Sequence, residues 1–190
     1  MYKKLVTFLV FSLYAPLAAF SADDPSRARL YIPVATSTTV SGCTTCGVKA
    51  SGYAADYVFG FGLGLGVSSS KISISYDHPL LDDYSVDTGT MINIGYTFGS
   101  DFTFTLGYGV GSSPSSDQKG PDSTYKVEGK SSTNAFLGLG YNIGTIEILL
   151  GMRSVNATLN QSYTSEYVGP VSYVAKYIWS STEIGVGFTF

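Results

Sequence analysis

Large apolar side chains alternate with glycine or small polar residues along most of this chain, and this period of two limits its fold more than any other feature. From Tyr57 to Val67, every odd-numbered residue is aromatic or aliphatic, and every even-numbered residue after Val58 is glycine. Successive side chains of a β-strand point to opposite faces, whereas so many glycines would destabilise a helix. The pattern therefore predicts strands.

The same alternation recurs often enough to predict an all-β chain of eight strands. The expected strands are residues 30–36, 57–67, 71–77, 91–98, 102–110, 134–141, 146–153 and 183–190. Short turns, expected at 68–70, 99–101 and 142–144, alternate with long loops, expected at 41–52, 79–88, 112–132 and 157–172. Pro33 cannot donate a hydrogen bond to a sheet, but this alternation requires a strand before residue 41 if both chain ends lie on the side of the short turns.

The two faces of these strands differ in a way that predicts a barrel in lipid. One face carries large apolar residues, and the other carries glycine, hydroxyl groups and scattered charges. The interior of an eight-stranded barrel is narrow, so small polar residues fit inside and large apolar residues outside. Aromatic residues at the strand ends next to the short turns predict a girdle at one membrane interface: Tyr96, Phe98, Phe102, Tyr141, Phe188 and Phe190. A soluble, lipocalin-like barrel is the alternative, and it would need the large apolar side chains inside.

These segments resemble a known class, the small eight-stranded bacterial outer-membrane barrels that include outer-membrane proteins A, X and W. The resemblance rests on residues 59–66, 92–110 and 185–190. It implies a closed antiparallel transmembrane barrel in a bacterial outer membrane, in contact with outer-membrane lipids and lipopolysaccharide. It also implies that the barrel-assembly machinery reads the C-terminal Phe190. Fold alone does not define a function within such a class.

The first residues have the layout of a secretory signal peptide. Lys3 and Lys4 precede an apolar stretch, and Ala19 and Ser21 provide small residues for cleavage. We expect a signal peptide at 1–21 and one barrel domain at 22–190, with a membrane anchor as the alternative reading of the N-terminus. The net charge of −3 and the lack of a basic cluster argue against nucleic-acid binding.

Four charged residues fall on the face that is expected to line the barrel: Lys71, Glu147, Arg153 and Glu183. A buried charge is costly unless it is paired, so these residues predict an interior ion-pair network. The network would either plug and stabilise the barrel or gate a path for small ions.

Cysteine and histidine are too few for most catalytic or metal sites. Export to an oxidising compartment favours a disulfide between Cys43 and Cys46, while a redox motif or half of a zinc site are the alternatives. The only histidine, His78, lies beside Asp77 without a recognisable catalytic pattern. The sequence thus predicts no enzyme, no metal and no cofactor.

The sequence favours a structural or surface-interaction role through the external loops. The polar loop at 112–132 is a candidate contact for host or phage surfaces. A narrow channel for small solutes or ions is the second hypothesis, and a lipid-modifying enzyme is the third.

Overall fold

The computed structural model describes residues 25–38, 46–76, 82–119, 125–165 and 169–190, and almost all of them are in strands. The strands are β1 (Arg27–Thr38), β2 (Cys46–Val58), β3 (Leu63–Tyr76), β4 (Tyr84–Phe98), β5 (Phe102–Gly111), β6 (Ser115–Ser116), β7 (Lys126–Ile143), β8 (Ile146–Ser165) and β9 (Gly169–Thr189). Within these ranges, no helix has the length and apolar character needed to cross a membrane.

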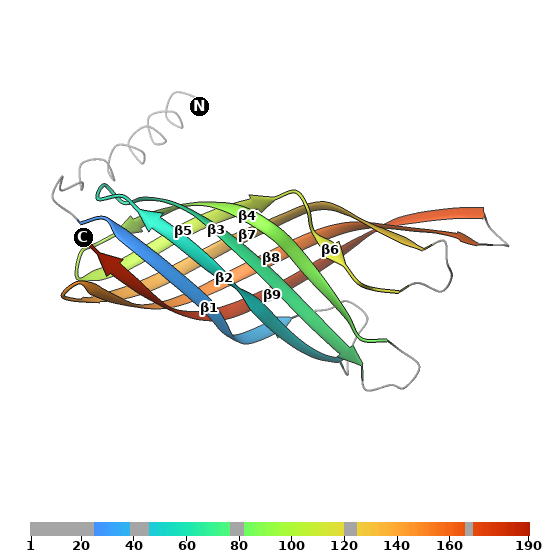
Figure 1. Cartoon of the computed structure of the whole chain (residues 1–190), viewed down its shortest axis with the longest axis horizontal. Coiled ribbons are helices and arrows are strands. Elements are labelled where there is room, and N and C mark those ends of the chain that lie inside the picture. The colour runs from blue at the N-terminus through green and yellow to red at the C-terminus, as the bar shows by residue number, and fades with distance from the viewer. Residues whose placement is uncertain (1–24, 39–45, 77–81, 120–124, 166–168) are drawn as a thin grey trace, which may run out of the picture.

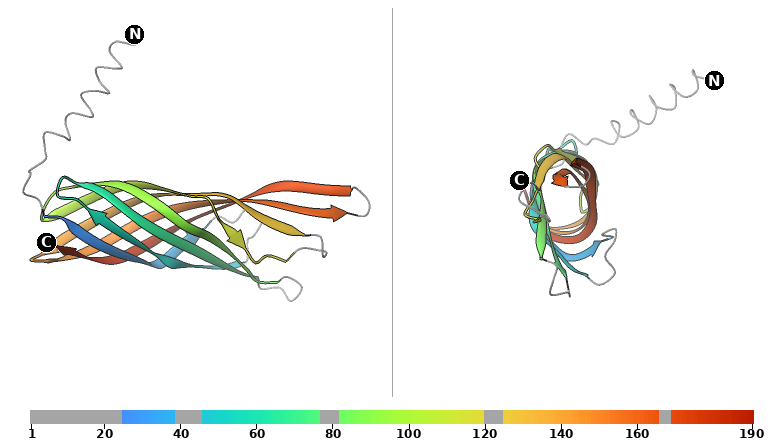
Figure 2. Two further views of the ribbon diagram at one scale, coloured as in Figure 1. Left: turned by 45° about the horizontal axis from the view of Figure 1, so that its top comes forward. Right: turned by 90° about the vertical axis from the view of Figure 1, so that its right-hand side faces the viewer.

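Eight of the strands close into a ring, as predicted. Each pairs antiparallel with its neighbours in the order β3-β2-β1-β9-β8-β7-β5-β4, and pairing of β3 with β4 completes the circle. The two-residue β6 pairs only with β4. Figure 1 shows the tilted strands with the start of β1 and the end of β9 at one end of the barrel, and the end-on view of Figure 2 shows the closed ring.

One predicted turn is wrong. The expected turn at 68–70 lies inside the continuous strand β3, and the chain instead reverses at residues 59–62. There Gly62 has φ +90°, a conformation that favours glycine, and its N–H donates to the carbonyl of Phe59 at 2.8 Å. The turn keeps the period of two, so the sequence pattern runs through it without a visible break.

The exterior confirms that the large apolar side chains face outward. Ile92 is 66 % exposed and Phe102 is 73 % exposed, and similar residues surround the barrel over the half that carries the short turns. Such a continuous apolar belt requires hydrocarbon around it. Aromatic rings contact one another at the turn end, as in the pairs Phe102–Tyr141 and Tyr96–Phe98, each with centroids 4.6 Å apart.

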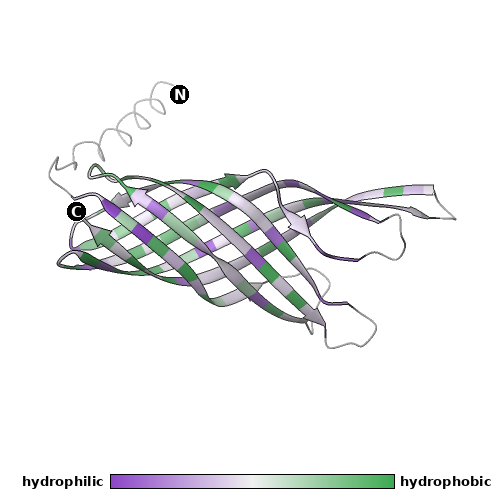
Figure 3. Cartoon of the chain, in the orientation of Figure 1, coloured by the Kyte–Doolittle hydropathy of each residue, from purple (hydrophilic) through white to green (hydrophobic). Residues whose placement is uncertain are grey.

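Beyond the belt the strands continue into what the sequence analysis expected to be loops. On β8, the outward residues change from Ile148, Leu150 and Met152 to Ser154, Asn156 and Thr158. The inward residues change in the opposite sense, from Glu147 and Arg153 to Val155, Ala157 and Leu159, all of which are buried. Figure 3 shows hydrophobic and hydrophilic residues alternating along the strands in both parts. The outer part of the barrel, which we call the extension, therefore has the apolar core and polar exterior of a water-soluble β-structure.

The core of the extension is a cluster of ten buried residues: Ile72, Ile74, Tyr84, Val86, Met91, Val155, Ala157, Leu159, Tyr177 and Trp179. The expected loops at 41–52, 79–88, 112–132 and 157–172 are thus largely strand where the structure describes them. The alternation of apolar and polar residues in these four segments does not match the pattern of the membrane-spanning strands, because here the apolar face points inward.

The predicted strand around Pro33 is confirmed. It extends from Arg27 to Thr38 and pairs with β9 along its whole length. The register shifts between Pro33 and Ala35, so that Val34 is an extra residue in β1. A bulge of this kind accommodates a residue without an N–H.

The inward glycines make room for large inward side chains. A Cβ atom added at Gly107 would overlap the ring of Phe136, and one added at Gly185 would lie 3.0 Å from the ring of Tyr31. Similarly, Gly187 lies against the side chain of Glu147. The glycine rows therefore accommodate large inward side chains of the adjacent strands, at the positions directly paired with the glycines.

We predict that Gly107→Ala destabilises the barrel by about 1–3 kcal/mol, because the new methyl group would overpack the site of the Phe136 ring. Urea unfolding in lipid vesicles would measure this change. Gly64→Ala is the matched control, since its nearest neighbour would be 3.6 Å away. Equal effects of the two substitutions would contradict this account of the glycines.

Candidate functional site

The lumen near the turn end holds a fully paired arginine. Arg29, on β1, donates from Nε to Glu147 Oε2 and from Nη2 to Glu147 Oε1, both at 2.7 Å. Its Nη1 also donates to the hydroxyl groups of Thr97 and Thr105, at 3.0 and 2.7 Å. Because β5 lies opposite β1 in the ring, this arginine ties together two opposite walls. Its side chain and that of Glu147 are both buried.

A second charged pair lies farther along the lumen. Arg153 Nε donates to Glu183 Oε1 at 2.8 Å, and its Nη1 donates to Asn134 Oδ1 at 3.1 Å. The guanidinium carbon also lies 4.6 Å from the centre of the Phe136 ring, a cation–π arrangement. The amide of Asn134 reaches Asn93 Oδ1 at 3.0 Å, which extends the polar contacts to β4.

A third brace marks the start of the apolar core. Trp179 Nε1, on β9, donates to Ser70 Oγ on β3 at 3.0 Å. Both side chains are buried, and their strands are three positions apart in the ring. The lumen thus contains two charged layers followed by an apolar layer, each bridged from wall to wall.

The structure brings together three of the four predicted interior charges with partners. Glu183 pairs with Arg153, but Glu147 pairs with Arg29, which the sequence analysis did not single out. Arg29 lies one residue before the predicted start of the first strand, in the same inward row as Tyr31. Extending the alternation by one residue would have identified it.

The prediction that Lys71 lies inside the barrel is wrong. Lys71 is exposed, while its neighbours Ser70 and Ile72 are buried. Even-numbered residues face inward along all of β3, so the error follows from the misplaced turn, which separated 71–77 from the strand to which it belongs.

The other predicted sites fall largely outside the described residues. Cys43 and His78 lie there, and Cys46 is described only as the first residue of β2, so the disulfide stays a prediction. The described part of the chain has no cluster of three His, Cys, Asp or Glu side chains that would suit a metal ion.

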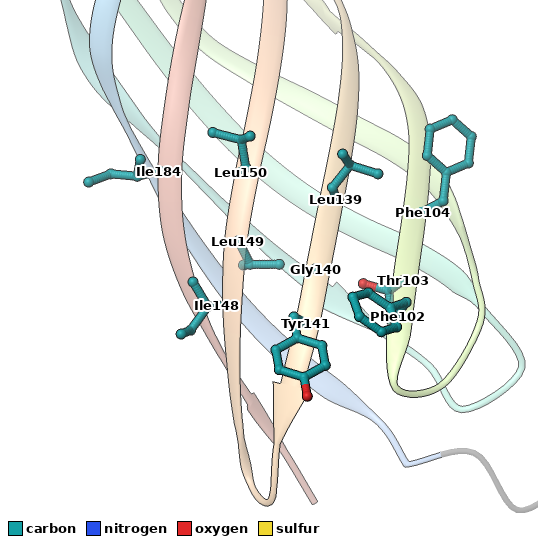
Figure 4. A pocket seen from close by; sticks show the side chains of 10 residues that line it. All are labelled: Phe102, Thr103, Phe104, Leu139, Gly140, Tyr141, Ile148, Leu149, Leu150 and Ile184. Atoms are coloured by element: carbon teal, nitrogen blue, oxygen red, sulfur yellow. The ribbon is translucent and has the colours of Figure 1, made fainter.

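A groove of about 540 Å³ lies on the lipid-facing side of the wall rather than in the lumen. Figure 4 shows Phe102, Tyr141 and Ile184 projecting around it from β5, β7 and β9. Its lining is almost entirely apolar, as expected for a surface covered by lipid chains.

A segment that we call the strap, residues 112–119, crosses the outer mouth of the barrel. It pairs with β4 through β6, and the carboxylate of Asp117 accepts hydrogen bonds from the N–H and the hydroxyl group of Ser85. On the far side, Gln118 Oε1 accepts from Gln161 Nε2 at 3.0 Å and from the Tyr177 hydroxyl at 3.1 Å. The strap therefore covers the apolar core of the extension.

The β8–β9 hairpin projects farthest from the barrel (Figure 1). The two strands stay paired as far as Ser165 and Gly169. Strand β1 pairs with β9 only as far as Trp179, so among the described residues β9 has a free edge over 169–178. Tyr173, Val174 and Ile178 are each about half exposed along it.

We predict that Glu147→Gln destabilises the protein by about 3–5 kcal/mol, because it leaves the Arg29 charge buried without a countercharge. The double variant Arg29→Met/Glu147→Met should lose less stability, since it removes both charges. Urea unfolding in lipid vesicles measures both. As a control, Lys119→Gln removes an exposed ion pair with Asp82 and should cost less than about 1 kcal/mol. A double variant less stable than Glu147→Gln would contradict the argument.

The strap should respond to acid through Asp117. Hydrogen bonds from Ser85 hold the pKa of this carboxyl group below its usual range. The anchoring is therefore complete above the ordinary aspartate pKa and is lost as the pH falls through the lowered value. Amide exchange of Ser85, corrected for its intrinsic pH dependence, should accelerate over that range.

Asp117→Asn should give the fast exchange already at neutral pH, whereas Asp101→Asn, at a short turn on the opposite end of the barrel, should leave it unchanged. Protection of Ser85 that is the same in Asp117→Asn as in the wild type would show that the carboxylate does not hold the strap.

Comparisons with known proteins show the fold and no more than the fold. No family model and no curated protein matches the sequence. The solid-state NMR structure of the outer membrane protein AlkL in DMPC lipid bilayers aligns with a TM-score of 0.55 and 11 % identity over 88 % of this chain and 90 % of that one. The outer membrane protein OprG from Pseudomonas aeruginosa aligns over 88 % of this chain and 96 % of that one at 13 % identity, but its TM-score of 0.49 is too low to support an inference. This chain thus has the fold of an eight-stranded transmembrane barrel of the outer-membrane kind.

Proposed function

We propose that the protein is an integral protein of a bacterial outer membrane that binds an extended polypeptide segment at the cell surface through its β8–β9 hairpin. The short turns face the periplasm and the extension faces outward, as is usual for bacterial barrels. The observation that carries the proposal is the edge of β9 over residues 169–178, which no described strand covers.

An open edge is suited to strand pairing, because its N–H and C=O groups point away from the sheet. Side chains at alternate positions then provide specificity. Tyr173 and Val174 are exposed next to this edge. A groove of about 360 Å³ also runs beside them between Glu128, Ser162 and Ser172, with both polar and apolar lining. These features favour a polypeptide partner over a small solute.

The two alternative functions find less support. A channel needs a continuous path, whereas the lumen is crossed by the Arg29 and Arg153 contacts and then by the apolar core. A lipid-modifying enzyme would require a set of catalytic groups, and the sequence offers for it a single histidine, His78, which lies outside the described residues. Phe190, 69 % exposed at the turn end, is accessible for the recognition by assembly machinery that the sequence suggests.

The test is to shorten the hairpin. Asn160 and Val174 are direct partners, so an Asn-Gly turn between them can replace residues 161–173. Besides the hairpin, the replacement removes the pairings of Lys126 and Val127 on β7 with Ser162 and Gln161, and the contact of Gln161 with Gln118. Peptides selected from a random library on the wild-type protein in nanodiscs should lose most of their affinity for the shortened variant. Their binding to the wild type should slow amide exchange at 170–178.

The matched control is Lys176→Gln, which changes the same hairpin without removing its edge. Peptides that bind the shortened variant as well as the wild type, or that protect amides elsewhere, would contradict the proposal.

A further inference from the structure

The two kinds of basic side chain are sorted between the inside and the outside of the barrel. Arg27, Arg29 and Arg153 are buried in the lumen. The lysines of the described ranges all lie beyond the apolar belt, in the extension or the strap: Lys49, Lys71, Lys119, Lys126, Lys130 and Lys176. Among the described residues, the exposed lysines are therefore confined to the outer end of the barrel, in a chain whose net charge is −3.

Two of these lysines lie side by side on the outer face of the wall. Ser51 pairs with Lys71 and Lys49 pairs with Ser73, which makes the lysines diagonal neighbours on β2 and β3. Residues in this relation are about 7–8 Å apart, within reach of a common ligand for long side chains. Both side chains are exposed.

Hydroxyl groups surround this pair. Ser51, Ser69 and Ser73 face outward on the same two strands, next to the lysines. We call Lys49, Ser51, Ser69, Lys71 and Ser73 the lysine–serine face. It combines positive charges with groups that both donate and accept hydrogen bonds, as a phosphorylated sugar requires.

The charges of this face are not neutralised by ion pairs. Neither Lys49 nor Lys71 pairs with an acid among the described residues, in contrast to Lys119, which pairs with Asp82 at 3.7 Å. Two carboxylates lie near Lys71, and both keep their negative charge. Asp87, directly opposite Lys71 on β4, accepts from the N–H of Gly89 at 2.7 Å, and Asp117, which accepts from Ser85, lies close enough for Lys71 to help lower its pKa. The cross-strand partner of Lys49 is Ser73 and carries no charge.

The two lysines lie at the level of the lipid headgroups along the membrane normal. Val67 and Tyr53 are the last large lipid-facing residues on the two strands, and each lysine follows four residues later along its strand toward the outer end. For a tilted strand, four residues rise about 10 Å along the membrane normal, which places the lysines at the outer edge of the headgroup layer, about 5–8 Å deep on each side of the hydrocarbon.

We infer that the lysine–serine face binds the phosphorylated headgroup of a glycolipid in the outer leaflet. The inference rests on the outer-membrane location proposed above, and it is independent of the hairpin edge. The lysines contact the phosphate groups, the serines contact the sugar hydroxyls, and the acyl chains continue down over Tyr53 and Val67.

The experiment compares bisphosphorylated lipid A with the same lipid after removal of its phosphates, each mixed into phosphatidylcholine nanodiscs that hold the full chain, with EDTA present. The wild-type protein should bind the phosphorylated form at least about tenfold more tightly, since two lysines near an anionic surface contribute about that much or more. Lys49→Gln/Lys71→Gln should abolish this preference, and Lys49→Arg/Lys71→Arg should keep it. Higher salt should weaken it.

Lys126→Gln/Lys176→Gln is the matched control, because it removes the same charge from exposed positions farther from the belt. An equal loss in this control would overturn the inference, as would an unchanged preference in Lys49→Gln/Lys71→Gln. The heat-induced shift in gel mobility verifies that each variant is a folded barrel.

The outcomes separate this inference from the proposal on which it rests. A wild-type chain that enters nanodiscs but binds both lipids equally overturns the inference alone. A chain that stays soluble without detergent overturns the outer-membrane location as well. The shortened hairpin variant should keep its preference for the phosphorylated lipid.

Discussion

The long strands of this barrel pass through two solvents, hydrocarbon around the lower half and water around the extension, and their side chains alternate between inside and outside in both. In the lower half the exterior is hydrocarbon, so the outward row is apolar and the inward row is polar or small. In the extension the exterior is water, so the same two rows exchange their chemistry. On β8 the change occurs between Met152 and Val155 without a bulge in its pairing with β9. Without a bulge, each row of side chains stays on its own side of a closed wall, so the sequence itself must change.

The lumen of the lower half must then be filled with groups that are polar yet fully paired. The charged side chains there are buried, and an unpaired buried charge would cost several kcal/mol. Arg29 meets this requirement because a planar guanidinium has five donors, and the structure supplies Glu147 and threonine hydroxyls to accept from them. Glycines on the adjacent strands, such as Gly140 and Gly187 beside Glu147, create the volume for these contacts. The glycine rows and the large inward side chains therefore depend on each other, because the glycines leave the space that those side chains occupy.

The sequence was sufficient for the architecture of the membrane-spanning half and insufficient for the extension. Alternation with large outward residues predicts β5 and the lower part of β8 closely, because both segments are surrounded by hydrocarbon along their whole length. The turn at 59–62 could not be distinguished from a strand, since its glycines and phenylalanines keep the period of two. The error then propagated to Lys71, whose face depends on where β3 begins. Pairings such as Arg29 with Glu147 join residues far apart in the chain, and only the strand order brings them together.

The sorting of arginine and lysine follows from the same constraint. A buried cation needs several fixed partners, and arginine offers a fork of donors that carboxylate and hydroxyl groups can satisfy from different walls. Lysine is a compact and strongly hydrated charge on a flexible stem, so it is better suited to a surface where water and mobile headgroups compete for it. In this chain the arginines hold the wall together from inside and the lysines meet the surroundings of the extension. A positive charge that serves only solubility has no reason to lie beside serines at one height above the belt, whereas a charge that meets membrane phosphates must lie there.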